Sequence, residues 1–312
     1  MKNSSVKPIL VTGSHRSGTT WTGKMIANSK QVHYIHEPFN IDKTLGFGCC
    51  RANFPYWYTH VHSENEDLYY AALKDTVNFR YSFLSVVKQL QSPPQIKTVL
   101  KDYIQFEKSK ALRLRPLLKD PLALFSAEWL SSSFNTDVLI LIRHPAAFVS
   151  SIKRKQWAFP FEHFLRQKTL LEKLPEHLQS DVRAYAQTPH DIILQASLLW
   201  NICHSKISDY VIHHPDWMFV KHEALSLEPA KEFQRIFLKL NLKFTPQIKS
   251  EILNYSSPDN LEEAPNQSFD YIKLDSRRNI KNWKQRLTQN EIFTVRSQVE
   301  SISHEFYGDE DW

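Results

Sequence analysis

Short apolar runs along the chain alternate with segments whose apolar positions recur at helical spacing. Residues 9–11, 32–35 and 138–142 are predicted strands, and the last is the continuous apolar run typical of a strand covered on both faces. Between the first two, residues 20–28 predict a helix because large apolar side chains lie four positions apart. This alternation predicts an α/β fold whose mostly parallel sheet is flanked by helices on both faces.

Later segments predict further helices with recognisable starts. Thr288 and Glu291 have the spacing of a capping box, which predicts the start of a final helix. Thr188 followed by Pro189 predicts the start of an earlier one. The sequence has no internal repeat and no linker rich in glycine or serine. We therefore expect a single α/β domain over residues 1–312, with helical insertions.

Glycine is scarce in this chain, and its distribution is uneven. The 312 residues include 6 glycines, whereas ordinary composition would give roughly twenty. Gly13, Gly18 and Gly23 lie within eleven residues, at the junction between the first predicted strand and helix. Because glycine is the residue that permits unusual backbone angles and close approach, this clustering indicates a local backbone requirement.

The composition is that of a globular protein with excess positive charge. Hydrophobic residues make up 42% of the chain and charged residues 23%, with a net charge of +6 and a pI near 9.0. This charge suits an anionic ligand but does not select among nucleic acid, phosphate, sulfate and an acidic glycan. The 14 histidines have no carboxylate or cysteine at recognised metal spacing, so we expect no metal.

Three features bear on the location of the protein. The longest aliphatic run, residues 138–142, is far shorter than the ~18 residues that a membrane span requires. Residues 1–8 contain two lysines and are followed by no apolar stretch of signal-peptide length. The 3 cysteines are too few for a disulfide framework. We therefore expect a cytoplasmic protein without a transmembrane segment.

The glycine cluster has the G-x-x-x-x-G spacing of a phosphate loop (P-loop). In residues 13–20 the spacing lies between a predicted strand and a helix, where backbone N–H groups and the helix dipole favour an anion. Thr19 follows Gly18 where nucleotide triphosphatases have lysine, and the loop cation is Arg16. The strand at 138–142 is followed by Arg143 rather than by a magnesium-binding aspartate. Both departures argue against ATP hydrolysis and kinase chemistry.

The loop sequence Ser-His-Arg-Ser-Gly-Thr-Thr-Trp at residues 14–21 resembles the 5′-phosphosulfate loop of sulfotransferases that use 3′-phosphoadenosine 5′-phosphosulfate (PAPS). In that family the loop cation contacts the phosphosulfate, the hydroxyl groups bind the 5′-phosphate, and the tryptophan stacks on adenine. The resemblance implies a PAPS co-substrate, release of adenosine 3′,5′-bisphosphate, and no metal requirement. The cofactor-binding residues that it implies are Arg16, Ser17, Gly18, Thr19, Thr20 and Trp21.

Two later segments resemble the parts of this family that bind the 3′-phosphate. Arg143 lies at a strand end, eight residues before Ser151, as in the family's strand-to-helix motif. Arginine offers a planar fork that matches phosphate oxygens, and the serine donates one more hydrogen bond. Residues 276–284 resemble a late basic segment before a Trp-Lys pair. They imply Arg277 or Arg278 as a further ligand, with Arg277 preferred, although a solvated basic loop fits either residue equally well.

Two residues match the chemical machinery of the family's carbohydrate and tyrosylprotein branches. Glu37, directly after the second predicted strand, matches a general base, and enclosure would tune its pKa upward. His36 is the rival base because imidazole titrates nearer neutrality. Lys119, in a Lys-Asp-Pro element, matches a lysine that holds the sulfuryl and bridging oxygens, and the resemblance implies that Arg16 stabilises charge beside it.

These assignments predict a PAPS-dependent sulfotransferase that acts on a hydroxyl group. We expect the acceptor to be a glycan or glycoconjugate rather than a small phenol, a protein tyrosine stays open as an acceptor, and we expect no nucleic-acid partner. Two alternatives stay open. A P-loop kinase or hydrolase would need ATP and magnesium, and a non-catalytic protein that binds adenosine 3′,5′-bisphosphate would not need Glu37. The sequence does not identify the acceptor or the oligomeric state.

Overall fold

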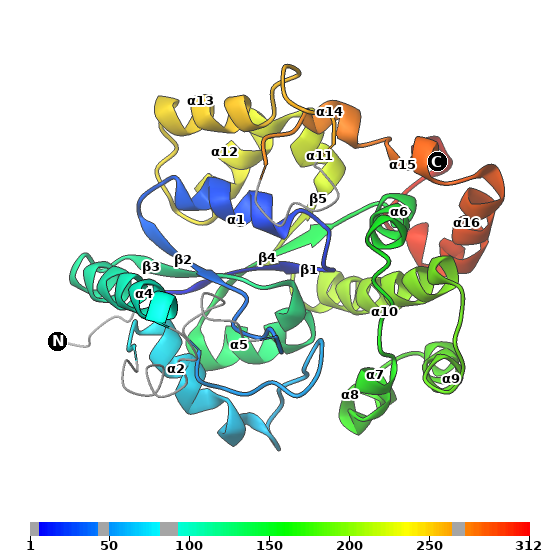
Figure 1. Cartoon of the computed structure of the whole chain (residues 1–312), viewed down its shortest axis with the longest axis horizontal. Helices are drawn as coiled ribbons and strands as arrows, with labels where there is room; N and C mark the ends of the chain where they lie inside the picture. The colour runs from blue at the N-terminus through cyan, green and yellow to red at the C-terminus, as the bar shows by residue number, and fades with distance from the viewer. Residues whose placement is uncertain (1–5, 43–49, 82–92, 264–271) are drawn as a thin grey trace. The chain divides into compact units, whose positions relative to one another are not determined.

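The computed structural model describes residues 6–42, 50–81, 93–263 and 272–312 (Figure 1). Proximity of residues divides the chain into two compact units. The first unit contains residues 1–12 and 22–139, and the second contains residues 13–21 and 140–312. The expectation of a single domain over the whole chain stays a prediction, and each unit is described by itself below.

A five-stranded sheet has the strand order β2-β3-β1-β4-β5. Strand β3 pairs in parallel with both β1 and β2, with Leu117 opposite Ile9 and Lys119 opposite His36. The predicted α/β fold with a parallel sheet flanked by helices is confirmed. The strands are β1 (Ile9–Gly13), β2 (Val32–His36), β3 (Arg115–Lys119), β4 (Asp137–Ile142) and β5 (Met218–Lys221).

The apolar runs of the sequence form the buried part of the sheet. Every residue of β1 is buried, and in β4 the five residues after Asp137 are buried. Continuous burial explains why these strands have no alternation of polar and apolar positions. Asp137 begins β4 one residue earlier than the apolar run predicts, and its carboxylate pairs with Lys7 at 2.5 Å and with Arg115 at 2.6 Å.

Stacked aromatic rings form part of the buried core of the first unit. Phe54 stacks between Phe39 and Tyr69, with ring centroids 4.1 Å and 5.0 Å apart. Such offset ring pairs add to the burial of apolar area that stabilises this part of the core. The elements are η1 (Glu66–Leu68), α2 (Tyr70–Val77), α4 (Pro93–Ala111), η2 (Pro121–Ser126) and α5 (Ala127–Phe134). Helix α1 (Thr19–Ala27) begins in the second unit and ends in the first.

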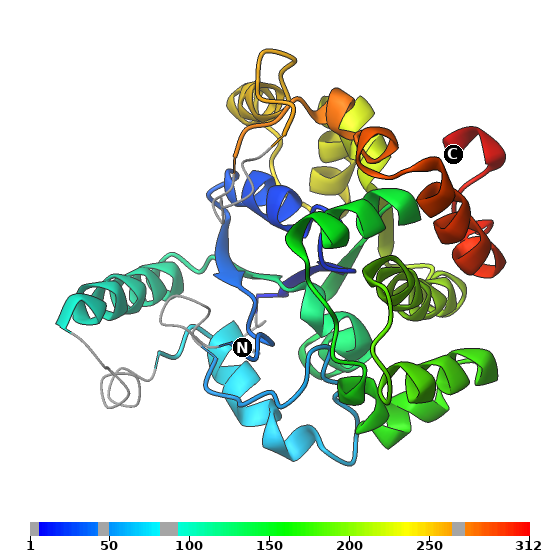
Figure 2. The same ribbon diagram turned by 45° about the vertical axis from the view of Figure 1, so that its right-hand side comes forward.

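Most helices of the second unit follow β4. Figure 1 and Figure 2 show α6, α10 and α16 side by side, and these three helices contact one another. Buried Trp200 on α10 donates from Nε1 to the Arg143 carbonyl at 2.9 Å, which ties this group to the end of β4. The helices are α6 (Pro145–Lys155), α7 (Glu162–Leu165), α8 (Lys168–Glu172), α9 (Glu176–Tyr185), α10 (Ile192–His213), α11 (His222–Leu227), α12 (Pro229–Lys239), α13 (Pro246–Tyr255), α14 (Ser276–Asn279), α15 (Trp283–Arg286), α16 (Gln289–Ser303) and η3 (Asp309–Asp311).

One predicted helix start is confirmed and the other is wrong. Thr288 and Glu291 form the capping box of α16. Helix α10 begins at Ile192 instead of near Thr188, because the Asp191 side chain accepts the Ile193 N–H at 2.8 Å and serves as N-cap. Thr188 instead donates to the carbonyl of Ala184 and closes the turn after α9. Among the described residues, no helix combines the length and apolar character needed to cross a bilayer.

The loop after β1 contains two glycines whose backbone excludes other residues. Gly13 has a φ of 140°, and a Cβ there would overlap the carbonyl oxygen of Leu141. Gly18 has a φ of 93°, and a Cβ there would lie 2.5 Å from Nδ1 of His222. These close approaches, with φ in the region that favours glycine, are the physical reason for the cluster in the sequence.

We predict that Gly13→Ala lowers the free energy of unfolding by roughly 2–4 kcal/mol, because it combines a disfavoured φ with overlap against rigid backbone. Urea denaturation followed by circular dichroism measures the loss. Gly308→Ala is the matched control, since Gly308 has a φ of −89° and its Cβ would meet only the flexible end of Glu310. Equal effects of the two substitutions would contradict this account.

Candidate active site

The loop between β1 and α1 is held in a tight turn. Ser17 donates to the Ser14 carbonyl from both its backbone N, at 3.2 Å, and its Oγ, at 2.5 Å. Arg16 has a φ of 66°, in the left-handed region, so the loop reverses direction at this residue. The turn leads directly into α1 at Thr19. Free N–H groups at a helix start together with a turn of this kind favour an anion.

The structure brings together Arg16, Ser151 and Arg143, which come from the two motifs of highest specificity in the sequence. Arg16 Nε donates to Ser151 Oγ at 2.9 Å, although the two residues are 135 positions apart. Arg143 Nη1 donates to the carbonyl oxygen of Arg16. Two guanidinium groups and a hydroxyl group therefore lie together at the loop, all within the second unit.

The positive charges in this group act on one another. Burial, followed by repulsion from Arg16 and Arg286 and against the attraction of Glu223, lowers the pKa of Arg143 to about 10. Enclosure and the charges of Arg154 and Arg286 also lower the pKa of Arg16. Both arginines stay protonated at neutral pH, so their mutual repulsion favours an anion beside them.

A buried donor supports the same interpretation. Arg143 Nε is buried and has no hydrogen-bond partner among residues 6–42, 50–81, 93–263 and 272–312. A buried unpaired N–H of a charged group is costly. Phosphate oxygens would satisfy it, and the planar guanidinium suits them. The residues therefore fit the phosphate-bearing co-substrate that the sequence predicts.

Trp21 lies on α1 and packs edge-on against two aromatic rings. Its ring centroid is 6.0 Å from that of His222 and 5.4 Å from that of Phe233. Trp21 Nε1 and His222 Nδ1 are buried and lack partners within the part of the chain that the structure describes. Burial, followed by the charge of Arg143, lowers the pKa of His222 to about 3, so this imidazole is neutral. Stacking of Trp21 on adenine stays a prediction.

The two late arginines contact residues outside the loop group. Arg277 Nε donates to the Leu227 carbonyl at 3.3 Å, and Arg278 Nε lies 3.4 Å from the Asp275 carboxylate. Asp275 also caps α14 by accepting both of their backbone N–H groups. Neither of these contacts reaches Arg16. The role of Arg277 and Arg278 as phosphate ligands stays a prediction.

The sequence analysis did not identify two arginines, Arg154 and Arg286, whose charges lower the pKa of Arg16 in the loop. Arg154 lies three residues after Ser151 on α6, on the same helix face, and this spacing could have drawn attention to it. Arg286 lies on α15, and nothing in its local sequence distinguishes it from the other basic residues of that segment. Its influence on Arg16 and Arg143 depends on packing within the second unit.

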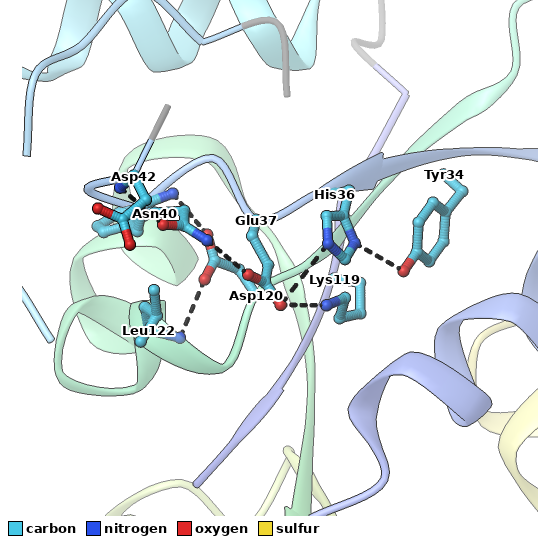
Figure 3. Close-up of polar contacts among 9 residues, drawn as sticks. Tyr34, His36, Glu37, Asn40, Asp42, Lys119, Asp120 and Leu122 are labelled. Atoms are coloured by element: carbon cyan, nitrogen blue, oxygen red, sulfur yellow. Dashed lines mark hydrogen bonds and ion pairs between the residues drawn. The ribbon is translucent and has the colours of Figure 1, made fainter. Parts of the chain in front are cut away.

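A separate polar cluster in the first unit contains the predicted base. Glu37 follows β2 with a φ of 43°, and its backbone N–H donates to the Lys119 carbonyl at 2.9 Å. Figure 3 shows the two side chains joined directly, as an ion pair between Lys119 Nζ and Glu37 Oε1. Asn40 Nδ2 donates to the other carboxylate oxygen at 2.9 Å. The parallel register of β2 and β3 positions this pair, since His36 is opposite Lys119.

The expectation that enclosure raises the pKa of Glu37 is wrong. Burial alone would raise it, but the charge of Lys119, with hydrogen bonds from Lys119 and Asn40, lowers the pKa of Glu37 below its usual value. Burial lowers the pKa of Lys119 against the attraction of Glu37, because its side chain is only 1% exposed. The carboxylate is therefore ionised at neutral pH, and the lysine neutralises it.

His36 lies beside this pair and is uncharged. Burial first, followed by the charge of Lys119, lowers the pKa of His36 to about 4 despite the attraction of Glu37. His36 Nδ1 is 3.1 Å from the Tyr34 hydroxyl, and Nε2 is 3.9 Å from Glu37 Oε1 (Figure 3). A neutral imidazole and an ionised carboxylate both accept protons, so the choice of base between His36 and Glu37 stays open.

Asp120 follows Lys119 and holds the backbone near this cluster through two hydrogen bonds. It is buried, and its carboxylate accepts the Phe39 N–H at 2.6 Å and the Leu122 N–H at 2.9 Å. Burial, together with the negative charge of Glu37, raises the pKa of Asp120 to about 7. Within the described ranges, the structure contains no group of histidine, cysteine and carboxylate side chains that could hold a metal ion. Metal independence stays a prediction.

The comparison with known families agrees with this geometry. The chain belongs to the sulfotransferase family, because the sequence pattern of that family matches residues 8–246. It is therefore an enzyme of the class that transfers sulfuryl groups. No curated protein matches the sequence. The relation to the carbohydrate and tyrosylprotein branches stays a prediction.

One solved structure shows the same fold at low sequence identity, and two others are similar with lower TM-scores. The sulfotransferase domain from the curacin biosynthetic pathway is 14% identical and has a TM-score of 0.50, covering 95% of this chain and 99% of that domain. The sulfotransferase domain of the Synechococcus PCC 7002 olefin synthase is 16% identical, with coverage of 96% and 98% and a TM-score of 0.46. A mouse sulfotransferase complexed with PAP is 9% identical, with coverage of 97% and 85% and a TM-score of 0.45.

The raised pKa of Asp120 predicts a pH dependence of stability. A folded-state pKa of about 7, above the usual 3.8, means that the folded chain binds the proton more tightly. The stabilisation by protonated Asp120 is full below the unfolded pKa and is lost as pH rises through about 7. The free energy of unfolding of wild type, minus that of Asp120→Asn, should therefore increase as pH falls from 8 to about 4.

Urea denaturation of both proteins across this pH range measures the difference. Asp137→Asn is the control, because Asp137 pairs with Lys7 and Arg115 at the other end of the strands. It should not reproduce the slope near pH 7. A difference for Asp120→Asn that stays constant with pH would show that Asp120 titrates in its ordinary range.

Proposed function

We propose that this chain transfers a sulfuryl group from PAPS to an acceptor hydroxyl and releases adenosine 3′,5′-bisphosphate. The observation that carries the proposal is the contact of Arg16 with Ser151 and Arg143, which joins the two phosphate motifs in one group. Membership of the sulfotransferase family supports the reaction class. The use of PAPS, the residue roles and the acceptor belong to the proposal.

The second unit would bind the nucleotide. The N–H groups of the loop and of the α1 start suit the 5′-phosphosulfate, with Ser17, Thr19 and Thr20 as hydroxyl donors and Arg16 as the cation. Arg143 and Ser151 suit the 3′-phosphate, because one supplies a planar fork and the other a hydroxyl group. The buried unpaired Nε of Arg143 supports this assignment.

Glu37 is the base in this proposal. Glu37 takes the proton of the acceptor hydroxyl as the acceptor oxygen forms a bond to sulfur, and the bond from sulfur to the bridging phosphate oxygen breaks. Lys119 keeps Glu37 ionised at neutral pH through their ion pair. It also provides a positive charge for the bridging oxygen, as the family resemblance implies. Arg16 would stabilise charge on the transferred group.

The acceptor that we propose is a hydroxyl of a glycan or glycoconjugate. This choice rests on Glu37 and Lys119, which match the carbohydrate and tyrosylprotein branches and which lie in direct contact here. The cytoplasmic location stays a prediction. The kinase and the non-catalytic binding alternatives are separated from this proposal by the experiments below.

Nucleotide binding is the first prediction of the proposed function. Adenosine 3′,5′-bisphosphate at about 100 times its Kd should raise Tm by roughly 5 °C, whereas ATP with magnesium should have less effect. Arg143→Ala should weaken binding of the bisphosphate by at least about tenfold, because a charge-assisted phosphate contact is lost. Thermal shift and calorimetry measure both effects, with Arg235→Ala as an exposed control, since Arg235 pairs with Glu232 on α12. Stabilisation by ATP with magnesium alone would refute the proposal.

Catalysis by Glu37 is the second prediction. Glu37→Gln should lower kcat by about 10²–10³-fold, since general-base catalysis contributes on this scale, and should leave the Kd of adenosine 3′,5′-bisphosphate unchanged. Transfer from labelled PAPS to a mixture of glycan acceptors measures the rate, and circular dichroism verifies folding without the buried ion pair. His36→Gln is the matched control and should keep kcat within about threefold. The reverse pattern would make His36 the base, and normal PAPS binding without transfer in wild type would favour a binding protein.

A further inference from the structure

Two arginines of the second unit converge on one carboxylate. Arg286 donates to Glu263 Oε1 from Nε at 2.8 Å and from Nη2 at 2.6 Å. Arg154 Nη1 lies 3.1 Å from the other oxygen, Oε2. The carboxylate therefore bridges two guanidinium groups from helices that are more than 100 positions apart in the sequence. Neither arginine has a role in the proposed function so far.

The two arginines lie in the same electrostatic environment as Arg16 and Arg143. Arg154 and Arg286 both repel the charge of Arg16, and Arg286 also repels that of Arg143. Arg154 lies one helical turn after Ser151 on α6, so the two side chains share a face of that helix. The four arginines therefore form a concentrated positive region, with Glu263 as a carboxylate paired to two of them.

The chemistry of this contact suits a phosphate as well as a carboxylate. Guanidinium groups bind both through parallel N–H···O bonds, but a phosphate monoester carries more charge and one more terminal oxygen. The arginines are largely enclosed, with side chains 25% and 18% exposed, whereas that of Glu263 is 37% exposed. Partly exposed ion pairs contribute little to stability, so a stronger anion can displace Glu263 at small cost.

We propose that Arg154 and Arg286 bind the 3′-phosphate of the nucleotide, and that the Glu263 carboxylate competes with this phosphate for them. This inference rests on the proposed function, because it assumes a ligand with a 3′-phosphate. It assigns the 3′-phosphate, not the 5′-phosphosulfate, because Arg154 shares its helix face with Ser151. Glu263 then tunes the affinity for the product and thus its release.

The test compares ligands that differ only in the 3′-phosphate. Calorimetry measures the Kd of adenosine 3′,5′-bisphosphate and of adenosine 5′-phosphate for wild type, Glu263→Gln and Arg286→Gln. The matched control is Glu262→Gln, which removes the neighbouring carboxylate, whose residue contacts Asn282. Circular dichroism and Tm verify that each variant is folded.

Removal of the competing charge should tighten binding. Glu263→Gln should lower the Kd of the bisphosphate by roughly five- to tenfold and leave that of the 5′-phosphate within about twofold. Arg286→Gln should raise the Kd of the bisphosphate by about tenfold, and Arg286→Lys should raise it less, because the charge stays and the fork is lost. Glu262→Gln should change neither Kd.

Other outcomes would overturn the inference. If Glu263 and Arg286 form only a structural ion pair, both substitutions will lower Tm without changing the ratio of the two Kd values. Equal tightening for both ligands would place the arginine pair at the 5′ side. If wild type binds neither nucleotide, the proposed function itself fails. If wild type binds the bisphosphate and Glu263→Gln does not tighten it, only the present inference fails.

Discussion

The close approach of Gly13 to the Leu141 carbonyl is the constraint on which the loop between β1 and α1, with Arg16, Arg143 and Ser151, depends. No Cβ fits at this position, so the chain passes from β1 into its loop directly against the end of β4. This approach allows Arg16 to reach Ser151 on α6 and allows Arg143 to reach the Arg16 carbonyl. A side chain at residue 13 would move the loop backbone and would separate these groups.

The same contact explains why so much positive charge is tolerated in one place. Arg16 and Arg143 repel one another, while the Arg16 carbonyl accepts from Arg143, the Ser151 hydroxyl accepts from Arg16, and the charge of Glu223 attracts Arg143. This repulsion lowers the stability of the fold. Binding of an anion would relieve it and would therefore be stronger. Glu263 offsets part of this repulsion through Arg154 and Arg286.

The cluster around Glu37 in the first unit shows the opposite arrangement, because its carboxylate and its lysine are paired. Glu37 and Lys119 neutralise each other, and Asp120 accepts two backbone N–H groups beneath them. A carboxylate held this way is ionised at neutral pH but is a weaker base than an unpaired buried one. In catalysis, its advantage would be a fixed position and a deprotonated state at neutral pH, rather than strong basicity.

The sequence by itself determined the α/β class, the strands β1, β2 and β4, the loop glycines, the capping box of α16 and the family, because periodicity and turn chemistry depend on neighbours in the chain. It did not predict β3 and β5. It placed the start of α10 near Thr188, since it overlooked the competing cap at Asp191. Only the tertiary structure decided that Lys119 lowers the pKa of Glu37 and that Arg154 and Arg286 join the positive region. Both depend on distances between residues from 82 to more than 100 positions apart, which packing sets and no local pattern encodes.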